Sequence, residues 1–133
     1  MQTIQARKKL TDEWRERGIE TDKEYAILTS EITKAWSGKT VREYKELKGL
    51  KKESLRDNMT DIELALNMLA EVTTTAISKR EQPTTFDESK KIAKRGGSVA
   101  KDARRSVEEQ LGESVISSLN ASNVEQLTTK KND

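Results

Sequence analysis

Apolar residues recur at helical spacing along most of the chain, and no stretch shows the period-two alternation of a strand. The clearest pattern lies over residues 61–80, where neighbours are three or four positions apart, which is the spacing of one helix face. We predict that this face is the main buried stripe of the fold. Its members are Ile62, Ala65, Leu66, Leu69, Val72 and Ala76. A second stripe is formed by Val99, Ala103, Val107 and Leu111.

Helix boundaries are marked by paired capping residues and by glycines. A Thr followed three positions later by Glu can form a capping box, in which each side chain accepts a hydrogen bond from the backbone of the other. This pattern occurs at Thr21–Glu24, Thr40–Glu43, Thr60–Glu63 and Thr85–Glu88. Gly18, Gly38, Gly49, Gly96 and Gly112 stand where helices are expected to stop. Together these signals predict six helices, over residues 3–17, 22–37, 41–48, 61–80, 86–95 and 99–111.

The pattern predicts an all-α fold, a compact multi-helix domain over residues 1–119 followed by a flexible, frayed polar tail at 120–133. A division into a helical pair at 1–38 and a main unit at 40–119 is also compatible with it. Val115, Ile116 and Leu119 are expected to dock as a last apolar segment. The β-branched run at 72–75 is a mediocre helix former, and the stripe on both sides must override it.

The composition predicts a thin core. Of 133 residues only 32% are hydrophobic and 4% aromatic, whereas 36% are charged. A chain with so few large apolar groups is expected to bury part of its surface in a partner or in a second copy. Trp14 and Trp36 are interpreted as core anchors of the first two helices, with an interface anchor as the alternative.

The residue types argue against catalysis. The chain has no Cys and no His, which removes thiol nucleophiles, disulfides, zinc sites and the usual general base. Acidic pairs such as Asp61 with Glu63, or Glu108 with Glu109, diverge on a helix surface. We therefore expect no enzyme, no catalytic residue, no cofactor and no metal. With no apolar run near the roughly 20 residues of a membrane span, and no signal peptide, the expected location is cytoplasmic.

Basic residues gather between Ser89 and Arg105, where seven stand against Asp102 alone. The Gly96-Gly97-Ser98 sequence within this segment predicts a turn whose free backbone N–H groups could bind an anion such as phosphate. It lacks the ending of a P-loop, so nucleotide hydrolysis is not supported. An ordinary helix end on a solvated basic face explains the same pattern, and both interpretations stay open. The candidate contacts are Lys90, Lys91, Lys94, Arg95, Lys101, Arg104 and Arg105.

A second basic cluster lies between Lys39 and Arg56, where seven basic residues face three acidic ones. Lysines at a helix C-terminus also favour the helix dipole, which needs no ligand. Aromatic residues are too sparse here for a single-strand stacking platform, which leaves phosphate contacts or an acidic protein surface. The candidate contacts are Lys48, Lys51, Lys52 and Arg56.

Two segments resemble a known family. The first is Lys-Gly-Leu-Lys-Lys at 48–52 followed by Met-Thr-x-x-Glu-Leu-Ala at 59–65, and the second is Lys-Ile-Ala-Lys-Arg-Gly-Gly-Ser-Val-Ala at 91–100. Over residues 7–121 the chain is similar to the C-terminal half of the DNA-damage-inducible protein D family and of related phage antirepressors with a BRO-type N-terminal domain. The resemblance implies a role in the DNA-damage (SOS) response or in phage regulation, and for the damage-inducible protein it implies action on RecA–DNA filaments.

The leading hypothesis is a non-enzymatic regulator that binds a protein–DNA assembly, such as a recombinase filament or a repressor. The alternatives are a direct nucleic-acid-binding module, or an oligomeric adaptor that blocks a host nucleic-acid-handling or defence complex. The expected partners are therefore a protein, DNA through the basic patches and a second copy of the chain, with no membrane.

Overall fold

The computed structural model describes residues 2–122, with side chains from residue 5 onward. Within that range the structure is all helical, as predicted, and contains no strand. Residues 123–133 of the predicted tail lie outside the described residues. The elements are α1 (Gln2–Glu16), α2 (Asp22–Ser37), α3 (Val41–Leu47), a 3₁₀ turn (Arg56–Asn58), α4 (Asp61–Glu81) and α5 (Phe86–Leu111).

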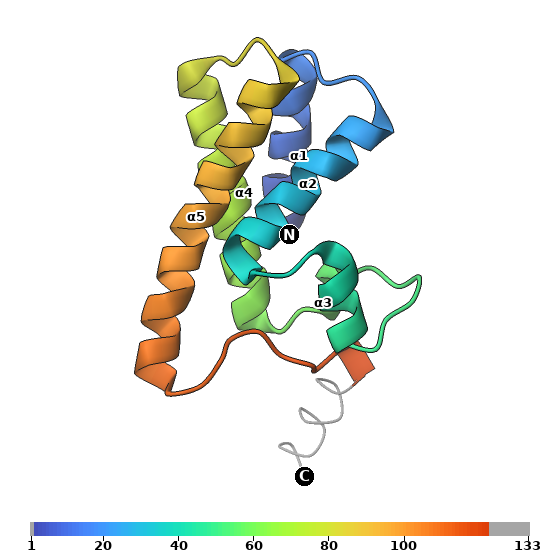
Figure 1. Ribbon diagram of the computed structural model, residues 1–133, viewed down its shortest axis with the longest axis vertical. Coiled ribbons are helices and arrows are strands. Elements are labelled where there is room, and N and C mark those ends of the chain that lie inside the picture. The colour runs from blue at the N-terminus through green and yellow to red at the C-terminus, as the bar shows by residue number, and fades with distance from the viewer. Residues whose placement is uncertain (1, 123–133) are drawn as a thin grey trace.

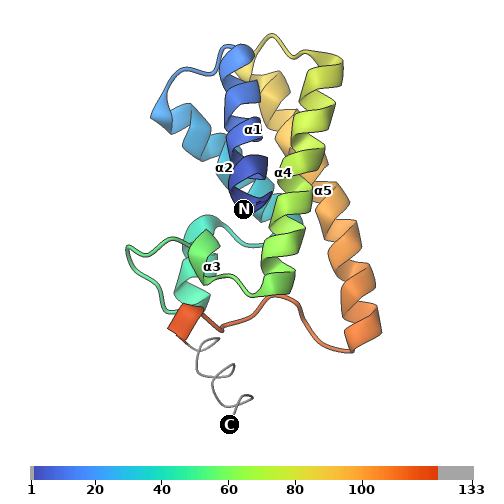
Figure 2. The ribbon, with the colours of Figure 1, turned by 180° about the vertical axis from the view of Figure 1, so that it is seen from behind.

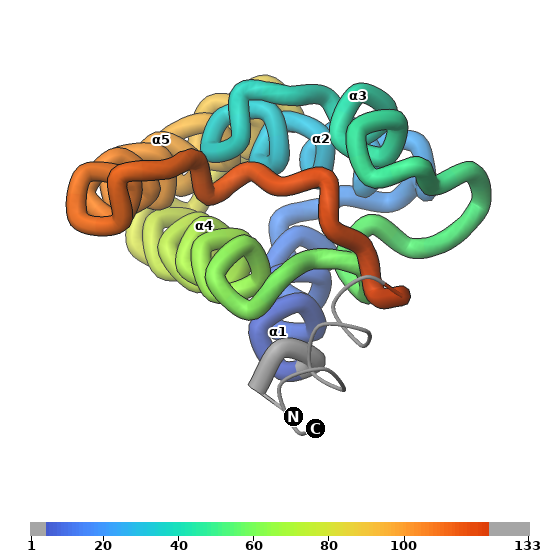
Figure 3. Tube along the Cα trace, turned by 90° about the horizontal axis from the view of Figure 1, so that it is seen from below, coloured from blue at the N-terminus to red at the C-terminus, as the bar shows by residue number. Residues whose placement is uncertain are grey.

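The two longest helices, α4 and α5, run side by side and are joined by a short connection at one end (Figure 1). Helix α2 packs on α5, and α1 packs on α4 (Figure 2). The segment after α5 crosses the opposite end of the molecule towards α3 (Figure 3), and we call residues 113–122 the C-terminal segment. None of the helices described is long and apolar enough to cross a membrane.

Capping residues set the starts of the helices as predicted. Thr21, Thr40 and Thr60 form reciprocal capping boxes with the Glu three positions later. At the start of α5 the box is not reciprocal. The Thr85 hydroxyl accepts a hydrogen bond from the backbone N–H of Glu88, but the Glu88 carboxylate accepts from the backbone N–H of Thr84 and not from that of Thr85. The predicted stops with left-handed backbone are Gly18, Gly38, Gly49 and Gly112.

The predicted break at Gly96 and Gly97 is wrong, so residues 2–122 form five α-helices where six were predicted. Helix α5 runs without interruption from Phe86 to Leu111, and both glycines are buried inside it. A Cβ on Gly96 would lie 2.9 Å from Cα of Thr74 in α4, and a Cβ on Gly97 would lie 2.5 Å from Cβ of Ala35 in α2. The glycines therefore allow three helix backbones to approach closely, which the sequence alone does not distinguish from a stop.

The predicted buried stripe of α4 is confirmed at Leu66 and wrong at its other five members. Ile62, Leu69 and Val72 are 38%, 37% and 52% exposed, and Ala65 and Ala76 are exposed as well. The helix is rotated so that its buried face is largely polar. That face consists of Glu63, Leu66, Asn67, Ala70, Glu71, Thr74, Thr75 and Ser78.

Polar partners on neighbouring elements explain this rotation. The indole Nε1 of Trp36 donates to Oδ1 of Asn67 at 3.1 Å, and the Ser78 hydroxyl donates to Glu13 at 2.7 Å. Buried polar groups are tolerated when they are hydrogen-bonded, so a helix can turn a polar face inward where the partners exist. In α5, Val99 and Leu111 of the second predicted stripe are likewise exposed.

The core interpretation of the tryptophans is confirmed. Trp14 and Trp36 are buried, and their rings lie 6.1 Å from those of Tyr25 and Tyr44, respectively. The predicted docking of the C-terminal segment is confirmed at Val115, which is buried in the core.

Replacing Gly96 with alanine is expected to destabilise the protein. Alanine favours a helix over glycine by about 1 kcal/mol, but the new methyl group would meet the Thr74 backbone, and such overpacking typically costs about 1–3 kcal/mol. Urea unfolding followed by circular dichroism should show a lower midpoint. Ser98→Ala, at an exposed position of the same helix, is the control and should be neutral or slightly stabilising. Equal stability of Gly96→Ala and the parent would contradict the tight contact.

Candidate functional site

The outward side of α5 carries a row of basic residues. Its inward side is fixed by residues such as Ile92, Ala93 and Ala100, which are buried. The basic residues lie away from these positions at spacings of four, seven and four, which places them on one side of a continuous helix. We call this row the basic face of α5, and it consists of Lys90, Lys94, Lys101 and Arg105.

An open groove of about 430 Å³ lies beside this face, between α2 and α5. It is lined by Lys34, Ala35 and Glu31 from α2 and by Lys94, Ser98 and Lys101 from α5. Lys34 was not among the residues predicted from the sequence. No local signal could have found it, because its position beside α5 depends on the contact between Ala35 and Gly97.

The groove is only partly neutralised by acidic groups. The ammonium groups of Lys90 and Lys94 each lie 3.9 Å from a carboxylate oxygen of Glu31, a long separation for partners at the surface. Surface ion pairs of this kind contribute little. Within the described part of the chain, Lys34, Lys101 and Arg105 form no ion pair. The groove and the face therefore carry an excess of positive charge open to a partner.

The other predicted residues of α5 are engaged elsewhere or face another side. The Arg95 guanidinium lies 2.7 Å from Glu81, and its hydrogen bond holds the pKa of Glu81 below the usual value. Arg104 donates to the carbonyl oxygen of Ser37 at 2.8 Å, so it joins α5 to the end of α2. Lys91 is exposed beside Glu81 and Glu88, away from the groove with α2.

The predicted anion-binding turn at Gly96-Gly97-Ser98 does not exist. All three residues lie in the middle of α5, where backbone N–H groups bond within the helix. The sequence expectation of a helix start with free donors is therefore wrong at this point. The basic side chains around it, and not the backbone, are what the helix offers to an anion.

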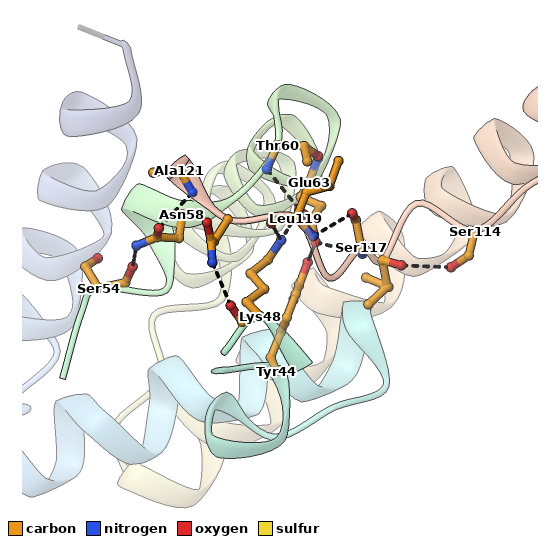
Figure 4. A network of polar contacts seen from close by, with 12 residues as sticks. Tyr44, Lys48, Ser54, Asn58, Thr60, Glu63, Ser114, Ser117, Leu119 and Ala121 are labelled. Carbon is orange, nitrogen blue, oxygen red and sulfur yellow. Dashed lines mark hydrogen bonds and ion pairs between the residues drawn. The ribbon is translucent and has the colours of Figure 1, made fainter. Parts of the chain in front are cut away.

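Lys48 of the second predicted cluster is buried and structural. Its ammonium group donates to Glu63 at 2.7 Å and to the carbonyl oxygen of Leu119 (Figure 4). The Tyr44 hydroxyl donates to the same Glu63. The pKa of Tyr44 is raised, mainly because the hydroxyl is buried and also because it donates this hydrogen bond. The Ser117 N–H also donates to Glu63, at 3.2 Å. This buried cluster fastens the C-terminal segment to α3 and α4.

Arg56 of the second predicted cluster is also in an ion pair, whereas Lys51 and Lys52 are exposed to solvent. Its guanidinium makes two bonds of 2.7 and 2.9 Å to the buried carboxylate of Glu71. Lys51 and Lys52 are exposed in the loop after α3. Lys51 lies with Arg42 and Lys45 around a separate open depression of about 620 Å³. The second cluster therefore presents Lys51, Lys52 and their neighbours in α3, but not Lys48.

Comparison with protein families finds a match over residues 1–127 to the model described as the DinD C-terminal domain. The chain belongs to the DinD C-terminal domain family. This confirms the family resemblance and links the chain to proteins of the DNA-damage response, while the BRO-type relationship stays a prediction. Comparison with curated proteins and with solved structures finds no significant match.

In this member of the DinD C-terminal domain family, Lys48→Met is expected to destabilise the fold strongly. The substitution leaves Glu63 buried without its cation, and breaking a buried pair in this way costs about 3–5 kcal/mol. Lys51→Met, three residues away and exposed, is the control and should change stability by no more than about 0.5 kcal/mol. Unfolding by urea measures both. A Lys48→Met variant as stable as its control would show that Lys48 is not structural.

Proposed function

We propose that the chain is a non-enzymatic regulator of the DNA-damage response, acting in the cytoplasm, that binds a protein–DNA assembly through the basic face of α5. The observation that carries the proposal is the excess of positive charge on that face and in the groove with α2. Lys34, Lys94 and Lys101 come from two helices and gather on one open surface.

The length of the basic face suits an extended polyanion. From Lys90 to Arg105 the helix rises about 22 Å at 1.5 Å per residue. Phosphates along one DNA strand are spaced about 3.4 Å apart along the axis, so the face can follow several of them. Lysines bind phosphate as point charges without reading sequence. The face therefore supports contact with a nucleic-acid backbone or with an acidic protein surface.

A protein–DNA assembly suits the chain better than bare DNA. Its net charge is only +2, and its described aromatic side chains are mostly in the core, where they cannot stack on bases. Affinity for DNA alone would rest on a few lysines and would be weak at physiological salt. A recombinase filament or a DNA-bound repressor offers both phosphates and a protein surface, and the resemblance to the DNA-damage-inducible protein D family implies a partner of this class.

Direct nucleic-acid binding is the second candidate. It is favoured by the additional basic surface around Arg42, Lys45 and Lys51, which could extend the track of a long polyanion. An adaptor that blocks a nucleic-acid-handling complex is compatible with the same face. The effect on strand exchange and the salt dependence of DNA binding separate these cases.

The double variant Lys94→Glu/Lys101→Glu is expected to lose its effect on a recombinase filament. The parent, added in stoichiometric excess, should change the rate of DNA strand exchange, and the variant should need at least about tenfold more protein because it places repulsive charge in the groove. Lys9→Glu/Lys23→Glu makes the same change in net charge at exposed positions outside the groove and should behave like the parent. No effect of the parent at excess would exclude the filament form of the proposal.

Salt dependence distinguishes direct DNA binding from docking on a protein. If the chain binds DNA alone, fluorescence anisotropy should show an affinity that falls steeply with salt, with a logarithmic slope of about −0.9 per phosphate contacted. The Lys94→Glu/Lys101→Glu variant should reduce that slope. A pull-down in which one protein partner persists after nuclease treatment would favour docking on a protein, whereas salt-independent DNA binding would contradict the phosphate contacts.

A further inference from the structure

The outer side of α4 presents an apolar stripe that no described element covers. In the view from below, α4 lies between α5 and α1 with its far side open (Figure 3). The exposed residues follow each other at spacings of three, four, three and four, which is the a/d pattern of a helix that pairs with another helix. We call them the α4 stripe, and they are Ile62, Ala65, Leu69, Val72 and Ala76.

We propose that this stripe is the interface of a homodimer in which α4 packs antiparallel on α4 of a second copy. The register of the stripe and the charges at its ends support this arrangement. A two-fold axis passing between Leu69 and Val72 would place Leu69 of one copy opposite Val72 of the other. The same axis would place Ala65 opposite Ala76, so the four central layers pair apolar residues, and Ile62 at each end would lie opposite Lys79.

The alanine layers favour close packing of the two helices. Paired small side chains let helix axes approach to the short end of the usual 8–10 Å range. Leu69 and Val72 then fill the centre, where apolar contact stabilises most. Because the same residues meet from both copies, the contact is isologous and closes as a dimer instead of continuing into a fibre.

Charges at the two ends of α4 complement each other in this arrangement. Asp61 is exposed at the N-terminal end of the stripe, and Lys79 and Arg80 are exposed at the C-terminal end. Within the described residues none of the three forms an ion pair. An antiparallel pair brings Asp61 of each copy level with Lys79 and Arg80 of the other, whereas a parallel pair would juxtapose like charges. The charges therefore select a second copy as the occupant and fix its direction.

Val99 of α5 is a further exposed apolar residue. It is exposed on the side of α5 that faces α4, next to Gly96, while the basic face lies on the side of the groove with α2. The proposed dimer therefore leaves the basic face open in both copies. Dimerisation through α4 is therefore independent of what the basic face binds.

Light scattering after gel filtration tests the dimer directly. The parent should show twice the 15.1 kDa of one chain at high concentration, and Leu69→Asp should show a single chain. Leu47→Asp is the matched control, because Leu47 is 39% exposed on α3 and Leu69 is 37% exposed on α4, and this variant should remain a dimer. Circular dichroism must show that both variants keep the helix content of the parent. A parent that is a single chain at every concentration, or a dimer that survives Leu69→Asp, overturns the proposal.

Cysteine crosslinking tests the direction, since the chain contains no Cys. Val72→Cys lies near the proposed axis and should form a covalent dimer on oxidation. Ile62→Cys should not, because in an antiparallel pair the two copies of position 62 are about 25 Å apart at 1.5 Å rise per residue. Crosslinking of both variants would indicate parallel helices and overturn the register.

Charge reversal tests the contacts at the ends of the stripe. Asp61→Lys should raise the dissociation constant of the dimer at least tenfold, and combining Asp61→Lys with Lys79→Asp and Arg80→Asp should restore it.

Discussion

A side chain larger than hydrogen at position 96 or 97 would collide with α4 or α2, and the arrangement of the surface depends on that constraint. At both positions α5 continues without a break. A continuous α5 in turn aligns Lys90 and Lys94 with Lys101 and Arg105 on one side. The contact of Gly97 with Ala35 also brings Lys34 beside α5 and so forms the basic groove. The charge pattern at the surface is therefore a consequence of packing at two glycines.

The interior holds an unusual share of charged and polar groups for a domain of this size. Glu13, Lys48, Glu63 and Glu71 are all buried, and each forms an ion pair with a described residue, while Oε1 of Glu13 accepts no hydrogen bond. Buried ion pairs are weak sources of net stability, but removing one partner is costly, so they specify which elements meet. Here Glu63 joins α3 and the C-terminal segment to α4, and Glu71 joins α1 and the loop before α4 to the same helix. A chain with few large apolar residues thus positions its helices largely through polar contacts.

This polar interior explains what the sequence could and could not predict. Capping boxes at Thr21, Thr40 and Thr60 are local, so three helix starts followed from residues three apart. The face of α4 that would be buried was not local, because Asn67 needs Trp36 from α2 and Ser78 needs Glu13 from α1. A hydrophobicity pattern therefore selected the wrong face. The same limit applies to the basic residues: Lys48 and Lys51 look alike in sequence, and only the partner Glu63 makes one structural and leaves the other exposed.

The misplaced stripe of α4 nevertheless carries information. A heptad spacing on an exposed face, in a chain poor in apolar residues, is the surface that the proposed dimer would bury. If α4 pairs with a second copy, the dimer carries two basic faces in fixed relation. Two weak phosphate-binding surfaces on one rigid body bind a repeating polyanion more tightly than either alone, because the second contact is intramolecular. A regular protein–DNA filament is a repeating target of that kind, so the proposed dimerisation through α4 would strengthen the proposed binding through α5.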